Sequence, residues 1–342
     1  MLRALVYSAG NGISASCGCP FPGRCEKASL RERTQIRIDV VSGFLGSGKT
    51  TFINKILPYC EGKVAIIENE YGETSIDGAL IEGNLPVTEI TAGCICCSLV
   101  GDFKKTIKAL DEQWQPDRVM IEPSGVSCFS DVLRACSEVR AELGDKVQLG
   151  RLITLVEAEG FEDYMEVFGA FYSDQIQNAN AILLSHTQDM DPADLEKVVA
   201  GIREINPQAA IWSQDWRDLD GSVLFDWVDG VGQDGFFAVE GEDRLLLNAK
   251  DTFGSCSFVS PAEWSEDELE AFLKELGSRA FGRVIRSKGF FAGPEGRVLH
   301  FDFTPYNHKI EVQEELPKVA LGTAVFIGCA LECDAIQARV MG

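Results

Sequence analysis

The sequence predicts an α/β fold in which a mostly parallel sheet with helices on both faces is followed by a smaller α+β domain. Two observations support this prediction. Apolar β-type runs alternate with helical patterns from residue 36 to about residue 235, and a glycine-rich phosphate-binding pattern follows the first of these runs. Runs that are apolar throughout are typical of parallel strands that are buried on both faces.

The composition is that of a globular protein with room for two domains. Of its 342 residues, 45% are hydrophobic and 25% are charged. Asp and Glu outnumber Lys and Arg by 53 to 31, and the formal net charge of −22 would repel phosphate backbones and anionic lipids. We therefore expect no nucleic-acid or membrane partner. The sequence shows neither a membrane span nor a secretory signal, so we expect a cytoplasmic protein.

The first domain is expected at residues 36–235. Its β-type runs are IRIDVVSG, KVAIIENE, DRVMIEPSG, GRLITLVEA, NANAILLSH and AAIWSQ. Residues 236–249 are rich in glycine and acidic residues and lack clear periodicity, which is typical of a linker. Residues 1–35 fit neither domain, and we interpret them as a cysteine-containing N-terminal extension.

The second domain is expected at residues 250–342. A strand-like run, TFGSCSFVS, precedes a helix-like segment, for which Ser260–Pro261 predicts the start and Gly277 the end. The strand-like runs that follow are RVIRSKGFFAG, GRVLHFDFTP, KIEVQEEL and AVFIGCA. This order of elements predicts an α+β domain.

The segment GFLGSGKT, residues 43–50, matches the Walker A pattern between a strand and a helix. Its backbone N–H groups would surround phosphate oxygens at a helix N-terminus, while Lys49 neutralises the outer phosphates and the Thr50 hydroxyl binds Mg²⁺. The residues expected to bind the nucleotide are Gly43, Gly46, Ser47, Gly48, Lys49, Thr50 and Thr51. The pattern predicts a P-loop NTPase sheet, and a glycine-rich turn without this function is the alternative.

Glu122 stands at the end of an apolar strand, and Ser124 and Gly125 follow it. The carboxyl ends of parallel strands are where ligands bind. We expect Glu122 to hold Mg²⁺ through water or to orient the attacking water, and the Gly125 N–H group to contact the γ-phosphate. Lys49, Glu122 and Gly125 are therefore the candidate catalytic residues. A solvated carboxylate without a catalytic role is the alternative for Glu122.

Three cysteines, Cys94, Cys96 and Cys97, have the spacing i, i+2 and i+3. Their thiolates can converge on one soft cation if the backbone turns tightly, which Gly93 permits. Three sulfur ligands suit Zn²⁺ and leave a fourth position for water or for a ligand from a client protein. A buried apolar cluster and a redox pair of Cys94 and Cys97 are the alternatives.

These motifs resemble the CobW-type metallochaperone P-loop GTPases, a family that includes the cobalamin synthesis protein CobW and nitrile hydratase activator-like proteins. The resemblance covers residues 36–331 approximately and rests on GFLGSGKTT, ENEYGE with the following ID, GCICCSL, IEPSG, VIRSKGFF and AVFIGCAL. It implies that GTP, Mg²⁺ and Zn²⁺ are bound, and that Glu70 and Asp77 lie in a nucleotide-sensitive switch near the metal. It also implies that hydrolysis controls metal delivery to a client metalloenzyme or apoprotein. We expect a monomer or a weak homodimer.

One segment departs from the family pattern. GTPases of this kind usually read guanine with an Asn-Lys-x-Asp loop, where this chain has Ser185 and His186 in the first two positions and Gln188 in the last. Only Asp189, one residue later, is chemically equivalent to the usual carboxylate that accepts the guanine N1 and N2 protons. His186 either stacks on the base or is an exposed loop histidine without this duty.

Other cysteines and the three histidines allow weaker interpretations. The N-terminal cysteines Cys17, Cys19 and Cys25 are one ligand short of a closed metal site. Cys329 and Cys333 are spaced for one helix face, where packing is favoured over metal binding. The chain has no histidine-rich tail, which argues against storage of several metal ions.

Two other functions remain open at this point. One is a metal sensor or buffer that uses the nucleotide only as a structural ligand, and the other is an activator of a corrinoid or other cofactor enzyme. If the protein is a GTPase, its turnover alone should be slow, because no residue is an evident built-in arginine finger.

Overall fold

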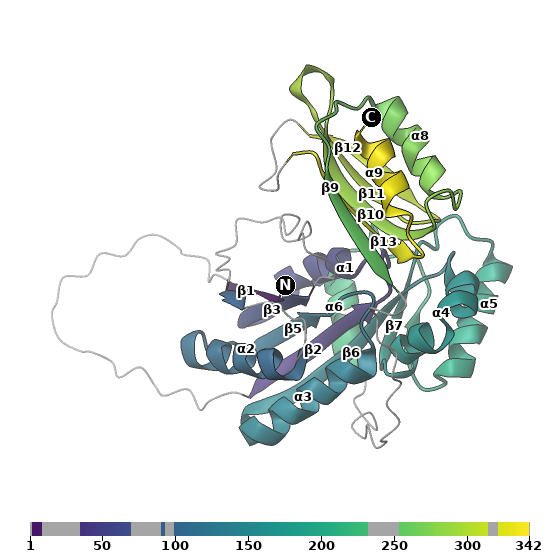
Figure 1. The fold of residues 1–342 in the computed structure, drawn as a ribbon. Coiled ribbons are helices and arrows are strands. Elements are labelled where there is room, and N and C mark those ends of the chain that lie inside the picture. Colours follow the sequence, from purple (N-terminus) through teal and green to yellow (C-terminus); the bar gives the residue numbers. More distant parts are fainter. Residues whose placement is uncertain are drawn as a thin grey trace, which may run out of the picture.

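The computed structural model describes residues 2–8, 35–69, 90–92, 99–231, 253–313 and 321–341. Within these ranges the chain forms an eight-stranded sheet and a five-stranded sheet, each covered by helices (Figure 1). None of the helices in the described ranges combines the length and apolarity needed to span a bilayer. The predicted fold class is confirmed.

The first sheet has the strand order β4-β1-β3-β5-β2-β6-β7-β8. Its six parallel strands are β2 (Ile36–Gly43), β3 (Lys63–Asn69), β5 (Arg118–Glu122), β6 (Val147–Glu157), β7 (Ala181–Ser185) and β8 (Ala210–Trp212). Two antiparallel edge strands extend it, β1 (Leu2–Ser8) and β4 (Ile90–Ala92). Strand β1 lies within residues 1–35, which were predicted to be an N-terminal extension, and it pairs with β3 over seven residues.

Helices cover both faces of this sheet because successive strand residues, such as Val40 and Val41, are buried in different apolar cores. One face packs against α1 (Lys49–Ile56) and α6 (Gly221–Gly230). The other packs against α2 (Leu99–Gln113), α3 (Phe129–Leu143), α4 (Phe161–Gln177) and α5 (Pro192–Ile205). Short 3₁₀ turns occur at Leu57–Tyr59, Gly144–Lys146 and Pro294–Gly296.

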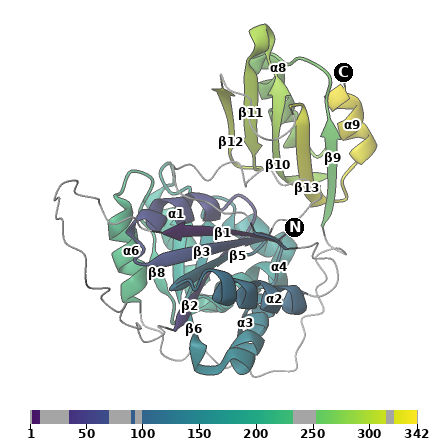
Figure 2. The ribbon, with the colours of Figure 1, turned by 90° about the vertical axis from the view of Figure 1, so that its left-hand side faces the viewer.

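The second sheet is antiparallel, in the order β12-β11-β10-β13-β9. Its strands are β9 (Gly254–Val259), β10 (Arg283–Ala292), β11 (Val298–Phe303), β12 (His308–Gln313) and β13 (Thr323–Cys329). Aromatic residues of one face, including Phe291 and Phe301, pack against α8 (Glu266–Leu276) and α9 (Cys333–Met341). Figure 2 shows this second domain above the first, and Val298 and Val325 of its other face join the core of the first domain.

Two local predictions for the second domain are wrong. Helix α8 begins at Glu266 rather than at Ser260–Pro261, because Ser265 and Glu268 form a capping box that satisfies the first backbone N–H groups. The predicted end of this helix at Gly277 is confirmed. Cys329 ends strand β13 and Cys333 begins α9, so these two cysteines do not share a helix.

Candidate functional site

The phosphate-binding pattern forms the turn between β2 and α1. Gly46 and Gly48 have positive φ angles of 84° and 91°, which side-chain-bearing residues rarely adopt. Gly48 is the N-cap of α1 and provides no side-chain capping bond. The first N–H groups of the helix are therefore positioned to receive phosphate oxygens. Of the other positions in the pattern, Ser47 is buried and its hydroxyl donates to the Phe44 carbonyl at 2.9 Å.

Lys49 lies within this turn rather than in solvent, with only 9% of its surface exposed. Its ammonium group donates to the Gly43 carbonyl at 3.0 Å and to the Phe44 carbonyl at 3.1 Å. These two bonds hold the cation beside the amide groups of the loop. The geometry suits neutralisation of a phosphate by Lys49.

The structure brings together Thr50, from the start of α1, and Glu122, from the end of β5. The Thr50 hydroxyl donates to the Glu122 carboxylate at 2.8 Å. Hydroxyl and carboxylate oxygens are ligands that Mg²⁺ prefers, so this pair has the chemistry to hold that ion directly or through water. Gly125 is close by: a Cβ atom added to it would lie 2.6 Å from the Leu45 nitrogen. The loop after β5 therefore packs directly against the phosphate-binding turn.

A cavity of about 500 Å³ opens beside these residues and is bounded by both domains. The first domain contributes Lys49, Thr50, Thr51, Glu122 and Gly125, among others. The second contributes polar side chains that the sequence analysis did not assign to the site, including Arg286, Lys288, His300, Asp302, Thr304 and Lys309. In the sequence, the alternation of the basic Arg286 and Lys288 with Ser287 in β10 could have indicated these residues. Only the packing of the two domains shows which face of this strand lies at the cavity.

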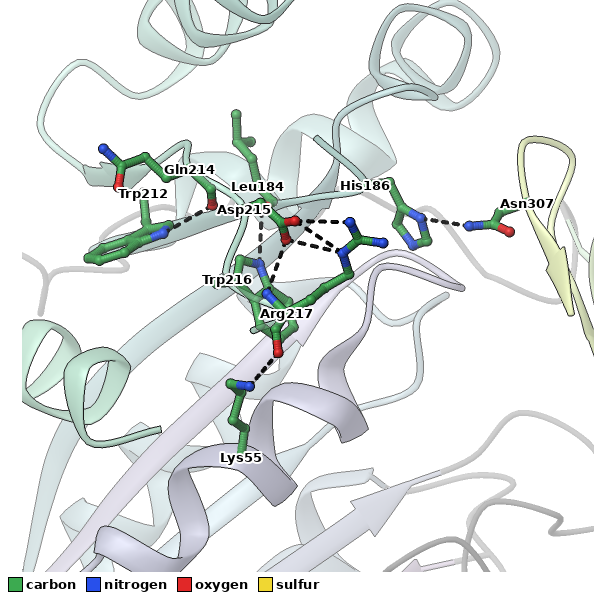
Figure 3. Close-up of polar contacts among 9 residues, drawn as sticks. All are labelled: Lys55, Leu184, His186, Trp212, Gln214, Asp215, Trp216, Arg217 and Asn307. Carbon is green, nitrogen blue, oxygen red and sulfur yellow. Dashed lines mark hydrogen bonds and ion pairs between the residues drawn. The ribbon is translucent and has the colours of Figure 1, made fainter. Parts of the chain in front are cut away.

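The turn between β11 and β12 contacts the phosphate-binding turn. A Cβ atom added to Gly46 would lie 2.4 Å from the Thr304 methyl group, so a larger residue at position 46 would force the Thr304 side chain to shift. Asn307, in the same turn, lies 3.0 Å from His186, measured between Nδ2 and Nδ1 (Figure 3). The second domain therefore contacts both the phosphate end and the predicted base end of the site.

The predicted base-reading loop follows β7. His186 is half-buried with a φ of 55°, and burial lowers the pKa of its imidazole. Its stacking on the base stays a prediction. Ser185 is buried, with its hydroxyl 3.5 Å from the Val156 carbonyl. Asp189 is exposed. The neighbouring loop carries Arg217, whose guanidinium pairs with Asp215 at 2.9 Å (Figure 3).

The predicted soft-metal ligands lie outside the described residues. These are Cys94, Cys96 and Cys97, together with the switch residues Glu70 and Asp77, and the same holds for Cys17, Cys19, Cys25 and the linker at 236–249. Strand β4 and helix α2 are the described elements on either side of the three cysteines. In the described ranges, no group of three or more His, Cys, Asp or Glu residues could hold a metal ion.

Glu157, at the end of β6, joins the two domains and is fully buried. Its carboxylate accepts from the Tyr164 hydroxyl at 2.8 Å and from the Thr304 hydroxyl at 3.4 Å. Burial raises the pKa of Glu157 to about 7, and its hydrogen bonds and the nearby Arg286 lower the pKa less than burial raises it. The folded protein therefore holds a proton on Glu157 more tightly than the unfolded chain does.

A pH-dependent stability follows from Glu157. Between its ordinary pKa of 4.5 and about 7, the folded state binds more protons, so the free energy of unfolding falls as pH rises. A shift of this size is worth about 3 kcal/mol. We expect thermal denaturation from pH 5 to 8 to show this loss for the wild type, and Glu157→Gln to remove most of it. The exposed control Glu166→Gln should behave as the wild type does, and an unchanged slope in Glu157→Gln would contradict the assignment.

The phosphate-binding turn, the Thr50–Glu122 pair and the parallel sheet that carries them define a P-loop nucleotide-binding protein. Comparison with protein families is more specific. Residues 37–213 match the CobW/HypB/UreG nucleotide-binding domain, and residues 253–342 match the C-terminal domain of the cobalamin synthesis protein cobW. The chain therefore belongs to the CobW family of metallochaperone GTPases, and the predicted resemblance is confirmed.

Curated relatives span most of the chain. The zinc chaperone YjiA of Escherichia coli is 26% identical over 319 residues, which are 90% of this chain and 98% of YjiA. The zinc chaperone CobW of a Sinorhizobium species is 26% identical over 292 residues, covering 75% of this chain and 78% of the relative. Among solved structures, Zn(II)-bound YjiA GTPase from E. coli aligns with a TM-score of 0.42 at 22% identity, over 90% of this chain and 98% of that one.

Proposed function

We propose that this protein hydrolyses GTP and uses its nucleotide state to control delivery of zinc, or a similar divalent metal, to a client metalloenzyme. The observation that carries the proposal is the contact between Thr50 and Glu122 beside the phosphate-binding turn. It supplies an oxygen-lined position for Mg²⁺ next to Lys49, which a protein that merely stores metal does not require. Mg²⁺ would stabilise charge on the phosphates, while Glu122 would orient the attacking water.

In this proposal the transported metal is held by Cys94, Cys96 and Cys97. Their segment connects the first sheet, through β4, to α2 of the same domain. The relatives named zinc chaperones support zinc as the metal. Glu70 and Asp77 would belong to the switch that transmits the nucleotide state to these cysteines.

The test measures phosphate release from GTP while the zinc concentration is varied. A chaperone that couples the two sites should hydrolyse GTP slowly by itself, and zinc should change the rate. A protein that binds GTP and zinc but releases no phosphate above the rate in buffer would instead be the sensor or buffer. An activator of a corrinoid or other cofactor enzyme is not favoured by any described contact.

The base-reading loop leads to a separate prediction about nucleotide choice. If Asp189 accepts the guanine N1 and N2 protons, GTP should bind at least about tenfold more tightly than ATP, or about 1.4 kcal/mol. Competition titrations would measure this ratio for the wild type and for Asp189→Ala, which should bind both nucleotides about equally. The control Asp194→Ala removes an exposed carboxylate that forms an ion pair with Lys197 on α5, and should keep the preference. Equal affinities in the wild type would contradict the role of Asp189.

A further inference from the structure

Basic side chains gather on the face of the second sheet that borders the cavity. Arg286 and Lys288 alternate with the buried Ser287 along β10, so both project from the same face of the sheet. Lys309 of β12 pairs in register with Asp302 of β11 and also borders the cavity. Such a cluster is notable in a chain with a formal net charge of −22. Its position opposite an anion-binding turn suggests that it serves the same anion.

Arg286 is the member of this cluster for which a close approach to the phosphate-binding turn is measured. Its Nη1 atom lies 3.0 Å from the position that a Cβ atom on Gly46 would take. The guanidinium is held by an ion pair between Nη2 and the Asp302 carboxylate at 2.5 Å. Its side chain is only 16% exposed. Arg286 therefore stands over the turn in a defined orientation.

The cavity connects Arg286 with the proposed reaction site. Arg286 lines the same space as Lys49, Thr50 and Glu122. A phosphate chain bound at the turn would have Lys49 of the first domain on one side and Arg286 of the second domain nearby. A guanidinium has several N–H donors in a planar arrangement that matches phosphate oxygens.

Three arginines in the parallel strands of the first domain fit this role less well. Arg37 and Arg118 lie at the starts of β2 and β5, the strand ends remote from the turn, and form ion pairs with Asp39. Arg151 donates to the Asp229 carbonyl. These residues form a network of ion pairs and hydrogen bonds with Asp39 and Asp229, at the end of the sheet opposite the phosphate-binding turn.

Arg217 is the strongest competitor, because it lies in the loop beside His186 (Figure 3). Its guanidinium donates three hydrogen bonds to the Asp215 carboxylate. It does not line the cavity that contains Lys49 and Glu122. Its position suits the base end of the site rather than the phosphates.

We infer that Arg286 is a catalytic residue, supplied by the second domain, that contacts the γ-phosphate of GTP during hydrolysis, and that Asp302 is its positioning residue. This inference rests on the proposed function. In the reaction, a water oxygen bonds to the γ-phosphorus while the bond from that phosphorus to the bridging oxygen breaks. The products are GDP, inorganic phosphate and a proton released to solvent. Arg286 would stabilise the negative charge that develops on the γ-phosphate oxygens and on the leaving oxygen.

The contacts of Thr304 and Asn307 with the first domain then have a catalytic consequence. They hold the second sheet against Gly46 and His186, and so keep Arg286 at the cavity. The second domain would then contribute a residue to the hydrolytic site, in addition to packing against the first domain. An arginine of the same chain would take the place of an arginine finger from an activating protein.

The test compares GTP hydrolysis by the full-length wild type, Arg286→Ala and Arg286→Lys. We expect kcat to fall at least about 100-fold in Arg286→Ala, with a smaller rise of about tenfold in KM, and added guanidinium to restore part of the rate. Arg286→Lys keeps the charge and the pairing with Asp302 but loses the planar donor group, so it should fold normally and still lose at least about tenfold in kcat. Asp302→Asn should cause a smaller loss, because the guanidinium remains but is oriented less well.

The matched control is Arg297→Ala, which removes an arginine of the same domain that pairs with exposed Glu295 and does not line the cavity. It should keep the wild-type kcat. If Arg286→Ala and Arg286→Lys both hydrolyse GTP within about threefold of the wild type, the inference about Arg286 is overturned while the proposed function stands.

If hydrolysis is absent, a binding measurement still tests the contact of Arg286 with the γ-phosphate separately from the proposed hydrolysis. If the wild type releases no phosphate, the proposed hydrolysis fails. Affinities for GDP and for a non-hydrolysable GTP analogue then show whether Arg286 contacts the γ-phosphate. Arg286→Lys and Arg286→Ala should weaken the analogue at least about tenfold and change GDP less than about twofold. Equal losses for the two nucleotides would overturn the contact.

Discussion

Lys49→Ala is expected to reduce GTP hydrolysis by at least about 100-fold and to weaken binding of the triphosphate more than binding of GDP. The physical reason is that the ammonium group, held by the Gly43 and Phe44 carbonyls, lies beside the loop amides that would receive the outer phosphates. Removal of a preorganised charge from such a site costs several kcal/mol of transition-state stabilisation. Phosphate release and titrations with GDP and a non-hydrolysable GTP analogue would measure the two effects.

Folding must be measured together with activity for this variant, because the Lys49 side chain is buried, with only 9% of the residue exposed. Loss of its two hydrogen bonds is expected to cost about 1–3 kcal/mol of stability, which a shift in Tm would report. The control Lys197→Ala removes an exposed lysine of α5 that pairs with Asp194 and should leave both activity and Tm unchanged. A folded Lys49→Ala protein with wild-type turnover would refute the assignment of the phosphate site.

Replacement of Cys94, Cys96 and Cys97 by serine is expected to abolish the dependence of nucleotide binding on zinc. Coupling between two sites is reciprocal, so a GTP analogue that tightens zinc binding must itself bind more tightly, by the same factor, when zinc is present. Zinc titrations with the GTP analogue, with GDP and without nucleotide would measure this factor in the wild type. Because thiols lose protons when they bind zinc, loading should release protons and weaken as pH falls.

The triple serine variant should retain basal nucleotide binding, because Lys49 and the loop amides do not involve these sulfur atoms. Cys256 and Cys333, whose thiols are hydrogen-bonded to one another in the second domain, offer a matched control. The Cys256→Ser, Cys333→Ser double variant should retain the zinc-dependent shift. Identical zinc affinities in all three nucleotide states of the wild type would show a metal site without a switch and would favour the sensor or buffer.

Much of the first domain could be predicted because its signals are local. Each parallel strand is an apolar run, and the phosphate-binding turn is a contiguous segment that joins β2 to α1. Glu122 could be assigned because parallel strands present their carboxyl ends at one edge of the sheet. The contact of Glu122 with Thr50, 72 residues away in sequence, agrees with that reasoning.

Other features could not be predicted from local patterns. Strand β1 has a short apolar sequence, and its identity as a strand depends on β3, about 60 residues later. The start of α8 was misplaced because Ser260–Pro261 and Ser265 are both plausible helix starts, and the capping box selects the second. The contact of His186 with Asn307 joins residues of two domains that are 121 positions apart.

The sequence by itself determined the class of fold and the phosphate-binding turn, because apolar periodicity and the Walker A pattern are properties of neighbouring residues. The family followed from the resemblance of several short motifs, which are also contiguous in sequence. Only the tertiary structure decided that the second domain borders the same cavity. Arg286 and Gly46 are 240 positions apart in the numbering, and nothing in either segment indicates that they meet. Their approach results from packing the open face of one sheet against the loops at the end of another, which depends on contacts across the whole chain.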